Sequence, residues 1–264
     1  MALQRDIVLV GSGNVATHLA RAIEPRLAAV LSRDVSHARE LAFSLDKSGA
    51  ISYGTPDVLR GLNPSIVILS VADHALKELA ANIGYLPGNP LVLHTSGTID
   101  KEALCPMSPR TGVLYPLQTF SKAKEVDMSR VPFFTEASNA EDLTITDALA
   151  SSISPTVNHA DETSRRKLHI AGVFASNFPN ILYEITGKIL ASAGYNLETV
   201  RPLVEAMTAK AFDIGPHAAQ TGPARRGDTD VINSHIAALP KDKAEIYRVL
   251  SDYIIASHKD NGKQ

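Results

Sequence analysis

The feature that most constrains the fold is a glycine-rich turn near the start of the sequence, Gly11 to Ala16 (GSGNVA), which fits the pattern G-x-G-x-x-A. The turn follows a continuous apolar run, Ile7 to Val10, of the kind that is buried on both faces in a parallel sheet. After it, Val15, Leu19 and Ile23 recur at the spacing of one helix face. Strand, glycine turn and helix in this order predict the start of a doubly wound α/β sheet.

Strand-like and helix-like segments alternate through the first half of the chain. Short apolar runs recur between segments with apolar residues at helical spacing, which is typical of a doubly wound sheet. The segments predicted to be extended are 7–10, 27–31, 51–53, 65–71, 91–94, 113–119, 131–135 and 156–160. A capping box of Ser138 and Glu141 predicts a helix that ends near Ile153.

From Asp161 onward the chain is expected to be almost wholly helical. The predicted helices are 161–192, 197–213, 229–238 and 241–257. The charged run Arg165-Arg166-Lys167 is expected to be a solvated helix face. This change of secondary-structure type predicts two domains, a Rossmann-like α/β domain over residues 1–160 and an all-helical domain over residues 161–264.

Composition and charge exclude several classes of protein. The 26 Lys and Arg residues nearly balance the 28 Asp and Glu residues, so the basic excess of a nucleic-acid-binding protein is absent. No apolar run approaches the roughly 20 residues of a membrane span, and residues 1–6 do not resemble a signal peptide. The single cysteine, Cys105, fits a reducing compartment. We therefore expect a soluble cytoplasmic protein without nucleic-acid or membrane partners.

Metal catalysis and serine hydrolysis find little support in the sequence. The nine histidines are scattered, and no pair of His or carboxylate residues has the spacing of a zinc protease. The G-x-S-x-G elbow of serine hydrolases does not occur. We therefore expect no metal site.

The glycine-rich turn predicts where a pyrophosphate group would bind. In this pattern Gly11 permits the tight turn, and Gly13 lets the backbone approach the anion. The helix that starts behind the turn offers free N–H groups. The alternative is an ordinary glycine-rich turn that holds no ligand. The position between a buried strand and a helix favours dinucleotide binding by Gly11, Ser12, Gly13, Asn14 and Val15.

The end of the second predicted strand bears on the choice of cofactor. NAD-binding folds place an acidic residue about 20 positions after the turn, but Ser32 and Arg33 occupy this place. Guanidinium and hydroxyl groups bind a 2′-phosphate, whereas a carboxylate repels it. Asp34 works against this interpretation, and the alternative is a solvated Arg33 with NAD as the cofactor. The charges favour NADP.

The loops after two central strands are expected to face the nicotinamide half of the cofactor, because the cofactor lies along the carboxyl ends of the strands. Val71, Ala72 and Ser96 lie in these loops and are predicted to contact it. Asp73 is interpreted as the N-cap of the following helix, and His74 as a surface residue.

Several motifs together resemble a known family. The GSGNVA turn, the Ser32-Arg33 pair and the helical C-terminal half resemble the superfamily of pyrroline-5-carboxylate reductases and β-hydroxyacid dehydrogenases. Tyr115–Ser121 (YPLQTFS), Val173–Phe178 (VFASNF) and Thr221–Asp228 (TGPARRGD) more specifically resemble the branch that joins a Rossmann-like domain to the domain of unknown function 2520. This resemblance covers essentially the whole chain. It implies an NADP oxidoreductase that forms a homodimer through its helical half.

The long predicted helix offers a candidate for proton transfer. The better-known relatives use a catalytic lysine or serine in the helical domain, but Lys167, His169 and Ser176 do not copy either pattern. At about 100° per residue, His169, Ser176 and Asn177 share one helix face. Histidine can donate a proton near neutral pH, and Ser176 and Asn177 can orient a carbonyl or imine. The alternatives are a hydrogen-bonded core histidine and a polar pair that satisfies backbone groups freed by Pro179.

The motif Thr221–Asp228 offers an anchor for an anionic substrate. Arginine pairs bidentately with carboxylates and phosphates, so Arg226 is the candidate anchor, with Asp228 beside it. The alternative has Asp228 or Thr229 capping the next helix and both Arg225 and Arg226 in water.

Together these features predict an NADP(H)-dependent oxidoreductase that reduces a small anionic ketone or imine. An apolar stripe on the helix between Leu197 and Ala211 supports a homodimer formed through the helical domain. Two alternatives remain open: a non-catalytic NADPH-binding sensor or scaffold protein, and hydride exchange with a deazaflavin cofactor.

Overall fold

The computed structural model describes residues 5–259 and divides into two compact units. The first unit ends at Asn177 and the second begins at Phe178. The last strand ends at His159 and the first helix after it begins at Glu162. The boundary between the two units therefore lies later in the sequence than the change from strands to helices. The reason is that the first helix after the last strand is bonded to the first unit through Arg165.

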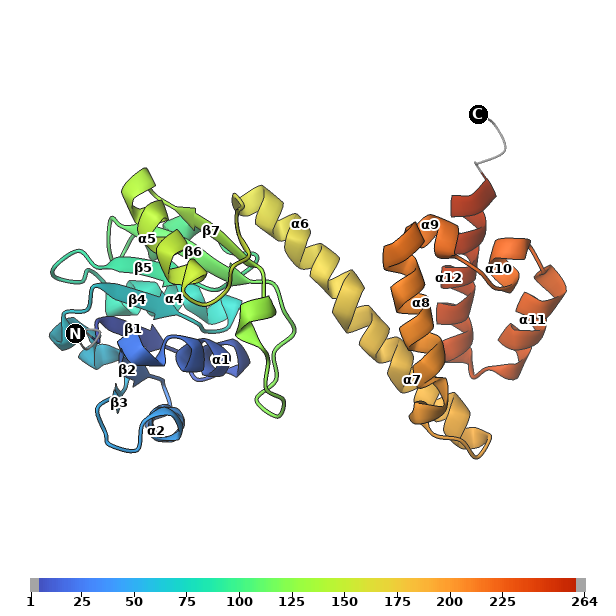
Figure 1. Ribbon diagram of the computed structural model, residues 1–264, viewed down its shortest axis with the longest axis horizontal. Coiled ribbons are helices and arrows are strands. Elements are labelled where there is room, and N and C mark those ends of the chain that lie inside the picture. Colours follow the sequence, from blue (N-terminus) through green and yellow to red (C-terminus); the bar gives the residue numbers. More distant parts are fainter. Residues whose placement is uncertain (1–4, 260–264) are drawn as a thin grey trace. The chain divides into compact units, whose positions relative to one another are not determined.

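The first unit is built on a sheet that has eight strands in the described part of the chain (Figure 1). Their spatial order is β3-β2-β1-β4-β5-β6-β7-β8, and neighbours are parallel except for the antiparallel pair β6 and β7. The reversal of strand order between β1 and β4 confirms the predicted doubly wound fold. The strands are β1 (Ile7–Val10), β2 (Leu27–Leu31), β3 (Ser52–Gly54), β4 (Ile66–Leu69), β5 (Leu91–His94), β6 (Thr111–Pro116), β7 (Phe133–Ala137) and β8 (Val157–His159).

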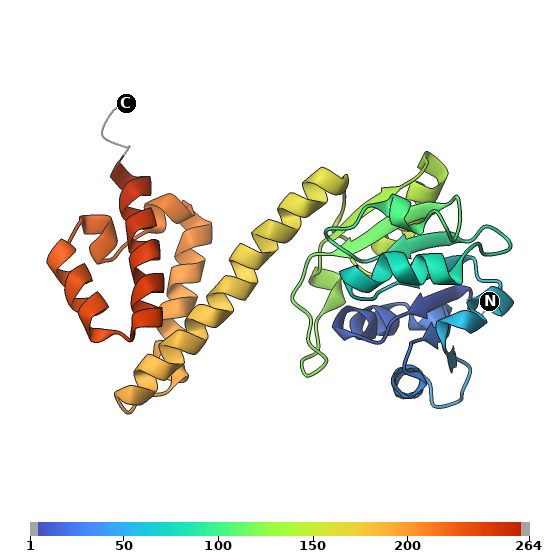
Figure 2. The same cartoon turned by 180° about the vertical axis from the view of Figure 1, so that it is seen from behind.

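Both faces of the sheet are covered by helices (Figures 1 and 2). Ile7 and Leu9 of β1 belong to one hydrophobic core, which also contains residues of α1, α2 and α5. Val8 and Val10 point the other way, into a second core shared with α3 and α4. Burial on both faces explains why β1 is a continuous apolar run. The helices are α1 (Asn14–Ala22), α2 (Val35–Leu45), α3 (Leu59–Leu62), α4 (Asp73–Ile83) and α5 (Ala140–Ser151).

Two helices begin differently from the expectation. The N-cap of α5 is Asn139, whose side chain accepts a hydrogen bond from the Asp142 amide, so the predicted capping box of Ser138 and Glu141 does not form. Asp73 is the first residue of α4 and not its cap, because its carboxylate accepts a hydrogen bond from the Thr98 hydroxyl in the loop after β5. The cap of α5 is therefore one residue after the predicted Ser138, and the cap of α4 is Ala72, one residue before the predicted Asp73.

The helix after β8, α6 (Glu162–Gly172), contains the largest departure from the sequence expectation. Arg165 is fully buried and not solvated. Its guanidinium forms an ion pair with Glu136 of β7 at 2.5 Å and donates to the backbone oxygens of Ile99 (2.6 Å) and Ala160 (3.3 Å). A buried arginine needs such partners, and they fasten α6 to the sheet and to the loop after β5. Arg166 beside it is exposed, as expected.

Between α6 and α7 lies a π-helical turn, Val173–Asn177. Pro179, two residues after the end of this turn, lacks the N–H group that would close a regular helical turn, which accounts for the irregularity. The predicted placement of His169, Ser176 and Asn177 on one face assumed a regular α-helix, but Ser176 and Asn177 belong to this π-helical turn.

The second unit is wholly helical, coloured from yellow-orange to red in Figure 1. Among its described residues, Ala224, Ile232 and Ser251 are buried, whereas many large apolar side chains are exposed. None of the helices within residues 5–259 is long and apolar enough to cross a bilayer. The helices are α7 (Phe178–Ser192), α8 (Arg201–Ile214), α9 (Pro216–Ala219), α10 (Pro223–Arg226), α11 (Thr229–Ala238) and α12 (Lys241–Lys259), with a 3₁₀ turn at Leu197–Val200.

Candidate active site

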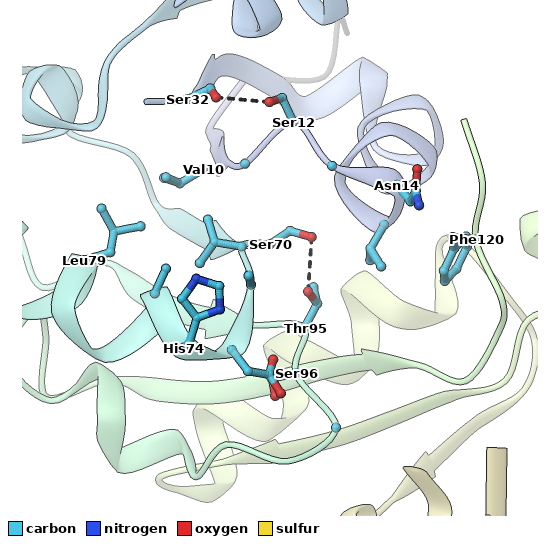
Figure 3. Close-up of a pocket in the computed structure, with 18 of the residues that line it drawn as sticks. Val10, Ser12, Asn14, Ser32, Ser70, His74, Leu79, Thr95, Ser96 and Phe120 are labelled. Carbon is cyan, nitrogen blue, oxygen red and sulfur yellow. Dashed lines mark hydrogen bonds between the residues drawn. The ribbon is translucent and has the colours of Figure 1, made fainter. Parts of the chain in front are cut away.

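A cleft of about 590 Å³ opens at the carboxyl ends of the central strands of the first unit (Figure 3). It is lined by the turns after β1, β2, β4 and β5, by the end of β6 and by His169 of α6. Doubly wound sheets bind ligands at this edge, where the strand order reverses. The structure brings all of the predicted cofactor-binding residues into the lining of this cleft, namely Gly11, Ser12, Gly13, Asn14, Val15, Ser32, Arg33, Val71, Ala72 and Ser96.

The glycine turn is shaped for close approach of an anion. Gly11 has a φ of +131°, and a Cβ at this position would lie 2.1 Å from the Ser70 carbonyl oxygen, so no larger residue fits. Gly13 is the N-cap of α1, and no heavy atom of the described residues lies within 4 Å of where its Cβ would be. The first turn of α1 contains no acidic residue, and the N-cap has no side chain to bond its N–H groups. These groups are therefore available to a phosphate.

The end of β2 forms the second part of the cleft. The hydroxyls of Ser12 and Ser32 lie 3.0 Å apart (Figure 3). Arg33, the next residue in the sequence, is exposed and also lines the cleft. Asp34, which weakened the prediction of NADP, is the N-cap of α2. Its carboxylate accepts hydrogen bonds from the hydroxyl and the backbone amide of Ser36, which hold its pKa below the ordinary value. Asp34 thus has a local structural role, while Arg33 lines the cleft.

The loops after β4 and β5 form the floor of the cleft. Thr95 donates a hydrogen bond to the hydroxyl of Ser70 at 3.1 Å, which joins the two strand ends (Figure 3). The Ser96 hydroxyl accepts hydrogen bonds from the backbone amides of Thr98 and Ile99 at 3.0 and 3.1 Å, so it shapes its own loop. His74 is exposed, as expected, but it also lines the cleft (Figure 3).

Tyr115 of β6 and His169 of α6 meet at the wall of the cleft. The Tyr115 hydroxyl lies 3.3 Å from Nδ1 of His169, and both residues line the cleft. Burial raises the pKa of Tyr115 above its ordinary value. The sequence predicted His169 as the proton donor, and it named Tyr115 to Gln118, with Ser96, as the alternative place for the site without giving Tyr115 a chemical role. The available signal was its position at the end of a strand, at the start of the YPLQTFS motif.

The rest of the YPLQTFS motif forms a loop fastened to α1. The buried His18 donates from Nε2 to the Ser121 carbonyl oxygen at 2.9 Å, and the Asn14 side chain accepts from the Lys122 amide at 3.2 Å. Phe120 packs on the His18 ring, with centroids 5.3 Å apart, and lines the cleft (Figure 3). The motif thus joins the wall of the cleft to the helix whose start would hold the phosphates.

A buried histidine lies beneath the loop after β5. His94 accepts a hydrogen bond at Nδ1 from the Ser96 amide, and its Nε2 has no partner among the described residues. Burial lowers the pKa of His94 to about 4, and the nearby Arg165 charge acts in the same direction. His94 is therefore neutral at physiological pH.

The other predicted catalytic residues lie outside this lining. Ser176 is half-buried and Asn177 is exposed in the π-helical turn, and the described lining of the cleft includes neither. Arg226 and Asp228 belong to the second unit, where Arg226 donates to the Asp228 carboxylate at 2.8 and 2.7 Å. Asp228 is the N-cap residue of α11, without a side-chain capping bond, because its carboxylate binds Arg226.

Fold and cleft define a class, the Rossmann-like α/β proteins with a helical C-terminal region. The family model named domain of unknown function (DUF2520) matches residues 131–254. The chain is also 37% identical to a putative NADP oxidoreductase from Bacteroides fragilis, with a TM-score of 0.85 over 95% of this chain and 97% of that chain. The protein therefore belongs to the DUF2520 family, as its motifs predicted.

More distant structures share the fold. A reductive aminase from Aspergillus terreus is 12% identical, with a TM-score of 0.70 over 95% of this chain and 92% of that chain. A pyrroline-5-carboxylate reductase from Coxiella burnetii is 14% identical, with a TM-score of 0.56 over 99% and 100% of the two chains. No curated protein matches the sequence.

Proposed function

We propose that the protein is an NADP(H)-dependent oxidoreductase that reduces a small anionic ketone or imine. One observation carries the proposal: a single cleft joins the uncapped start of α1, beside Ser32 and Arg33, to the Tyr115–His169 pair. One part of this cleft offers groups suited to a phosphorylated dinucleotide, and another offers groups that can move a proton.

Relatives with the same fold support this class of reaction. The 37% identical structure from Bacteroides fragilis is described as a putative NADP oxidoreductase. The reductive aminase from Aspergillus terreus was crystallised with NADPH and ethyl levulinate, and the Coxiella burnetii structure is a pyrroline-5-carboxylate reductase. Reductive amination and pyrroline reduction both act on a carbon–nitrogen double bond, which favours a ketone or imine substrate for this chain.

The residues of the cleft fit a nicotinamide dinucleotide. The backbone of residues 11–15 would hold the pyrophosphate, and Ser32 and Arg33 would bind the 2′-phosphate that distinguishes NADP from NAD. Val71, Ala72 and Ser96 would flank the nicotinamide half. When bound, the reduced cofactor supplies the hydride for the substrate carbon.

We assign the proposed catalytic roles by the charge of each side chain and by its ability to carry a proton. His169 supplies the proton that the reduced oxygen or nitrogen needs. Ser176 and Asn177 orient the carbonyl or imine. Arg226 binds the carboxylate of the substrate, held by its ion pair with Asp228.

A second copy of the chain is proposed to cover the second unit. Among the described residues of α7 to α12, only Ala224, Ile232 and Ser251 are buried, so these helices leave most of their apolar surface uncovered. Exposed apolar side chains on these helices include Leu203 (69%), Phe212 (88%) and Tyr253 (74%). A symmetric dimer buries the same patch of both copies at once, so we propose a homodimer through this unit.

The function is tested with purified protein in two measurements. NADPH binding is followed by fluorescence, and NADPH oxidation is followed across a panel of keto acids, imino acids and keto acids with amines, beside uncharged ketones. We expect turnover with an anionic member of the panel. Arg226→Ala should raise its KM, while the neighbouring Arg225→Ala serves as a matched control. Tight NADPH binding without turnover of any member would contradict the proposal and favour a sensor.

A further inference from the structure

Tyr115 is held rigidly at the wall of the cleft. A Cβ at Gly97 would come within 2.9 Å of Cζ of Tyr115 and within 2.9 Å of Nδ1 of His169, so both rings lie directly on the Gly97 backbone. Phe134 of β7 flanks the tyrosine, with ring centroids 6.4 Å apart. Only 7% of Tyr115 is exposed, yet it lines the cleft. Its hydroxyl therefore has a fixed position.

His169 connects this hydroxyl to solvent. It is an exposed residue of α6, and its Nδ1 lies 3.3 Å from the Tyr115 oxygen. Both side chains belong to the first unit, so this contact is independent of the second unit. A proton can pass from water to the imidazole, from the imidazole to the phenol, and from the phenol into the cleft.

We propose that Tyr115 is a catalytic residue, whose hydroxyl gives its proton to the substrate and receives another from His169. The inference rests on the proposed oxidoreductase function and specifies the path of its proton. Once the carbon of a ketone has accepted a hydride, the Tyr115 O–H bond breaks and an O–H bond forms on the substrate oxygen. The Nδ1–H bond of the His169 imidazolium then breaks and restores the Tyr115 hydroxyl. The neutral imidazole that remains takes up one proton (H⁺) from solvent.

The electrostatic surroundings keep Tyr115 in the state that this role needs. Burial raises the pKa of Tyr115, the Asp73 carboxylate of α4 adds to the effect, and the Arg165 guanidinium of α6 opposes it. The phenol therefore stays protonated through neutral pH. The newly formed alkoxide of a reduced ketone is a much stronger base than a phenolate, so proton transfer from the phenol is favourable.

Other titratable groups in the lining belong to α4 and suit the role less. Asp73 accepts a hydrogen bond from Thr98 and, as a carboxylate, has no proton to give at neutral pH. His74 and Glu78 also line the cleft, but within residues 5–259 no hydrogen bond joins either side chain to a second proton carrier as His169 is joined to Tyr115. His74 is therefore the competing donor that an experiment must exclude.

The first experiment measures the hydride-transfer rate by stopped-flow oxidation of NADPH with the best ketone of the panel. Tyr115→Phe should lower this rate about 10²- to 10⁴-fold, the usual contribution of a general acid, and should leave the Kd for NADPH within about threefold. Tyr85→Phe, an exposed tyrosine outside the cleft, is the matched control and should behave like the parent protein. His169→Ala should be partly restored by added imidazole, whereas Tyr115→Phe should not.

The second experiment needs no turnover. The ring-nitrogen resonances of His169 are followed by NMR in the NADP-bound protein, and Tyr115→Phe should shift the Nδ1 resonance, because the hydroxyl that lies 3.3 Å from this nitrogen is lost. A parent protein that turns over while Tyr115→Phe remains equally fast would overturn the relay alone. A large loss in His74→Gln, with Tyr115→Phe unaffected, would assign the proton to α4. Absence of turnover in the parent protein would end both the function and the relay, whatever the NMR spectrum shows.

Discussion

Arg33 and Asp34 are neighbours of opposite charge, and local hydrogen bonds give them different roles at the end of β2. The Asp34 carboxylate is bound to the Ser36 amide and hydroxyl at the start of α2, and Arg33 lines the cleft. An acidic residue next to an arginine is ambiguous in a sequence, because its charge can either pair with the arginine or cap a helix. The structure assigns Asp34 to the cap.

Removing the Arg33 guanidinium should therefore weaken NADPH binding selectively. Arg33→Ala is expected to cost about 1.5–3 kcal/mol, or roughly 10- to 150-fold in the Kd for NADPH, with little change for NADH. Arg39→Ala, which removes a nearby charge of α2 outside the cleft lining, is the control for long-range charge. Equal affinity of the parent protein for NADPH and NADH would contradict the proposed cofactor.

Gly97 is expected to tolerate no side chain, because Tyr115 and His169 occupy the place of a Cβ. Gly97→Ala should displace one of these rings, at a cost of about 1–3 kcal/mol in the free energy of unfolding, and should lower turnover while NADPH still binds. Gly187→Ala in α7 is the matched control, since no described atom lies within 4 Å of its Cβ position. Full activity of Gly97→Ala would show that the contact has no part in catalysis.

His94 should make the stability of the protein depend on pH in a defined window. Its pKa is about 4 in the folded protein and about 6.5 in an unfolded chain, so the unfolded chain binds more protons between these values. The free energy of unfolding is therefore highest above about pH 6.5, and protonation of His94 in the unfolded chain lowers it by about 3 kcal/mol as the pH falls to 4. Burial is the main cause of this lowered pKa and the Arg165 charge adds to it, while the Asp73 and Glu136 carboxylates oppose it. Urea unfolding should show the slope, and His94→Gln should reduce it.

At the scale of elements, α6 is fastened to the sheet by one buried ion pair. Glu136 of β7 binds Arg165 at 2.5 Å and Lys101 at 2.7 Å, and Arg165 is fully buried. Glu136→Gln leaves the buried guanidinium without its counter-charge and should cost about 3 kcal/mol in unfolding free energy. Glu162→Gln, which removes the exposed i,i+4 partner of Arg166, should cost less than about 0.5 kcal/mol. Equal effects of the two variants would contradict the structural role of Arg165.

The strands and helices were largely predictable, because burial on one or both faces leaves a period in the sequence. The run Ile7–Val10 and the turn after it could be interpreted locally, and the turn lines the cleft. The burial of Arg165 could not be predicted from its neighbours in the run Arg165-Arg166-Lys167. It depends on Glu136 of β7 and on the Ile99 backbone oxygen in the loop after β5, which are distant in the sequence. Tyr115 was predicted only as part of an alternative site, and its contact with His169 was not predicted for the same reason, because it joins residues 54 positions apart.

At the scale of the whole molecule, the exposed apolar side chains of the second unit predict its assembly. Sedimentation should give a dimer at micromolar concentration, and a double variant of Leu203→Glu and Phe212→Glu should give a monomer or a second unit that unfolds. Val58→Glu, an exposed apolar residue of the first unit, is the control and should remain a dimer. A parent protein that stays a folded monomer would contradict the proposed homodimer.

The π-helical turn at Val173–Asn177 has a consequence for any comparison between this chain and its relatives. Such a turn accommodates one more residue than a regular helical turn. A relative whose helix is regular at this point needs a gap of one residue in its alignment with this chain, placed between Gly172 and Phe178. Without that gap, every residue of this chain from α7 onward is aligned one position away from its true counterpart in the relative. The role of a residue in the relative is then assigned to the wrong side chain of this chain.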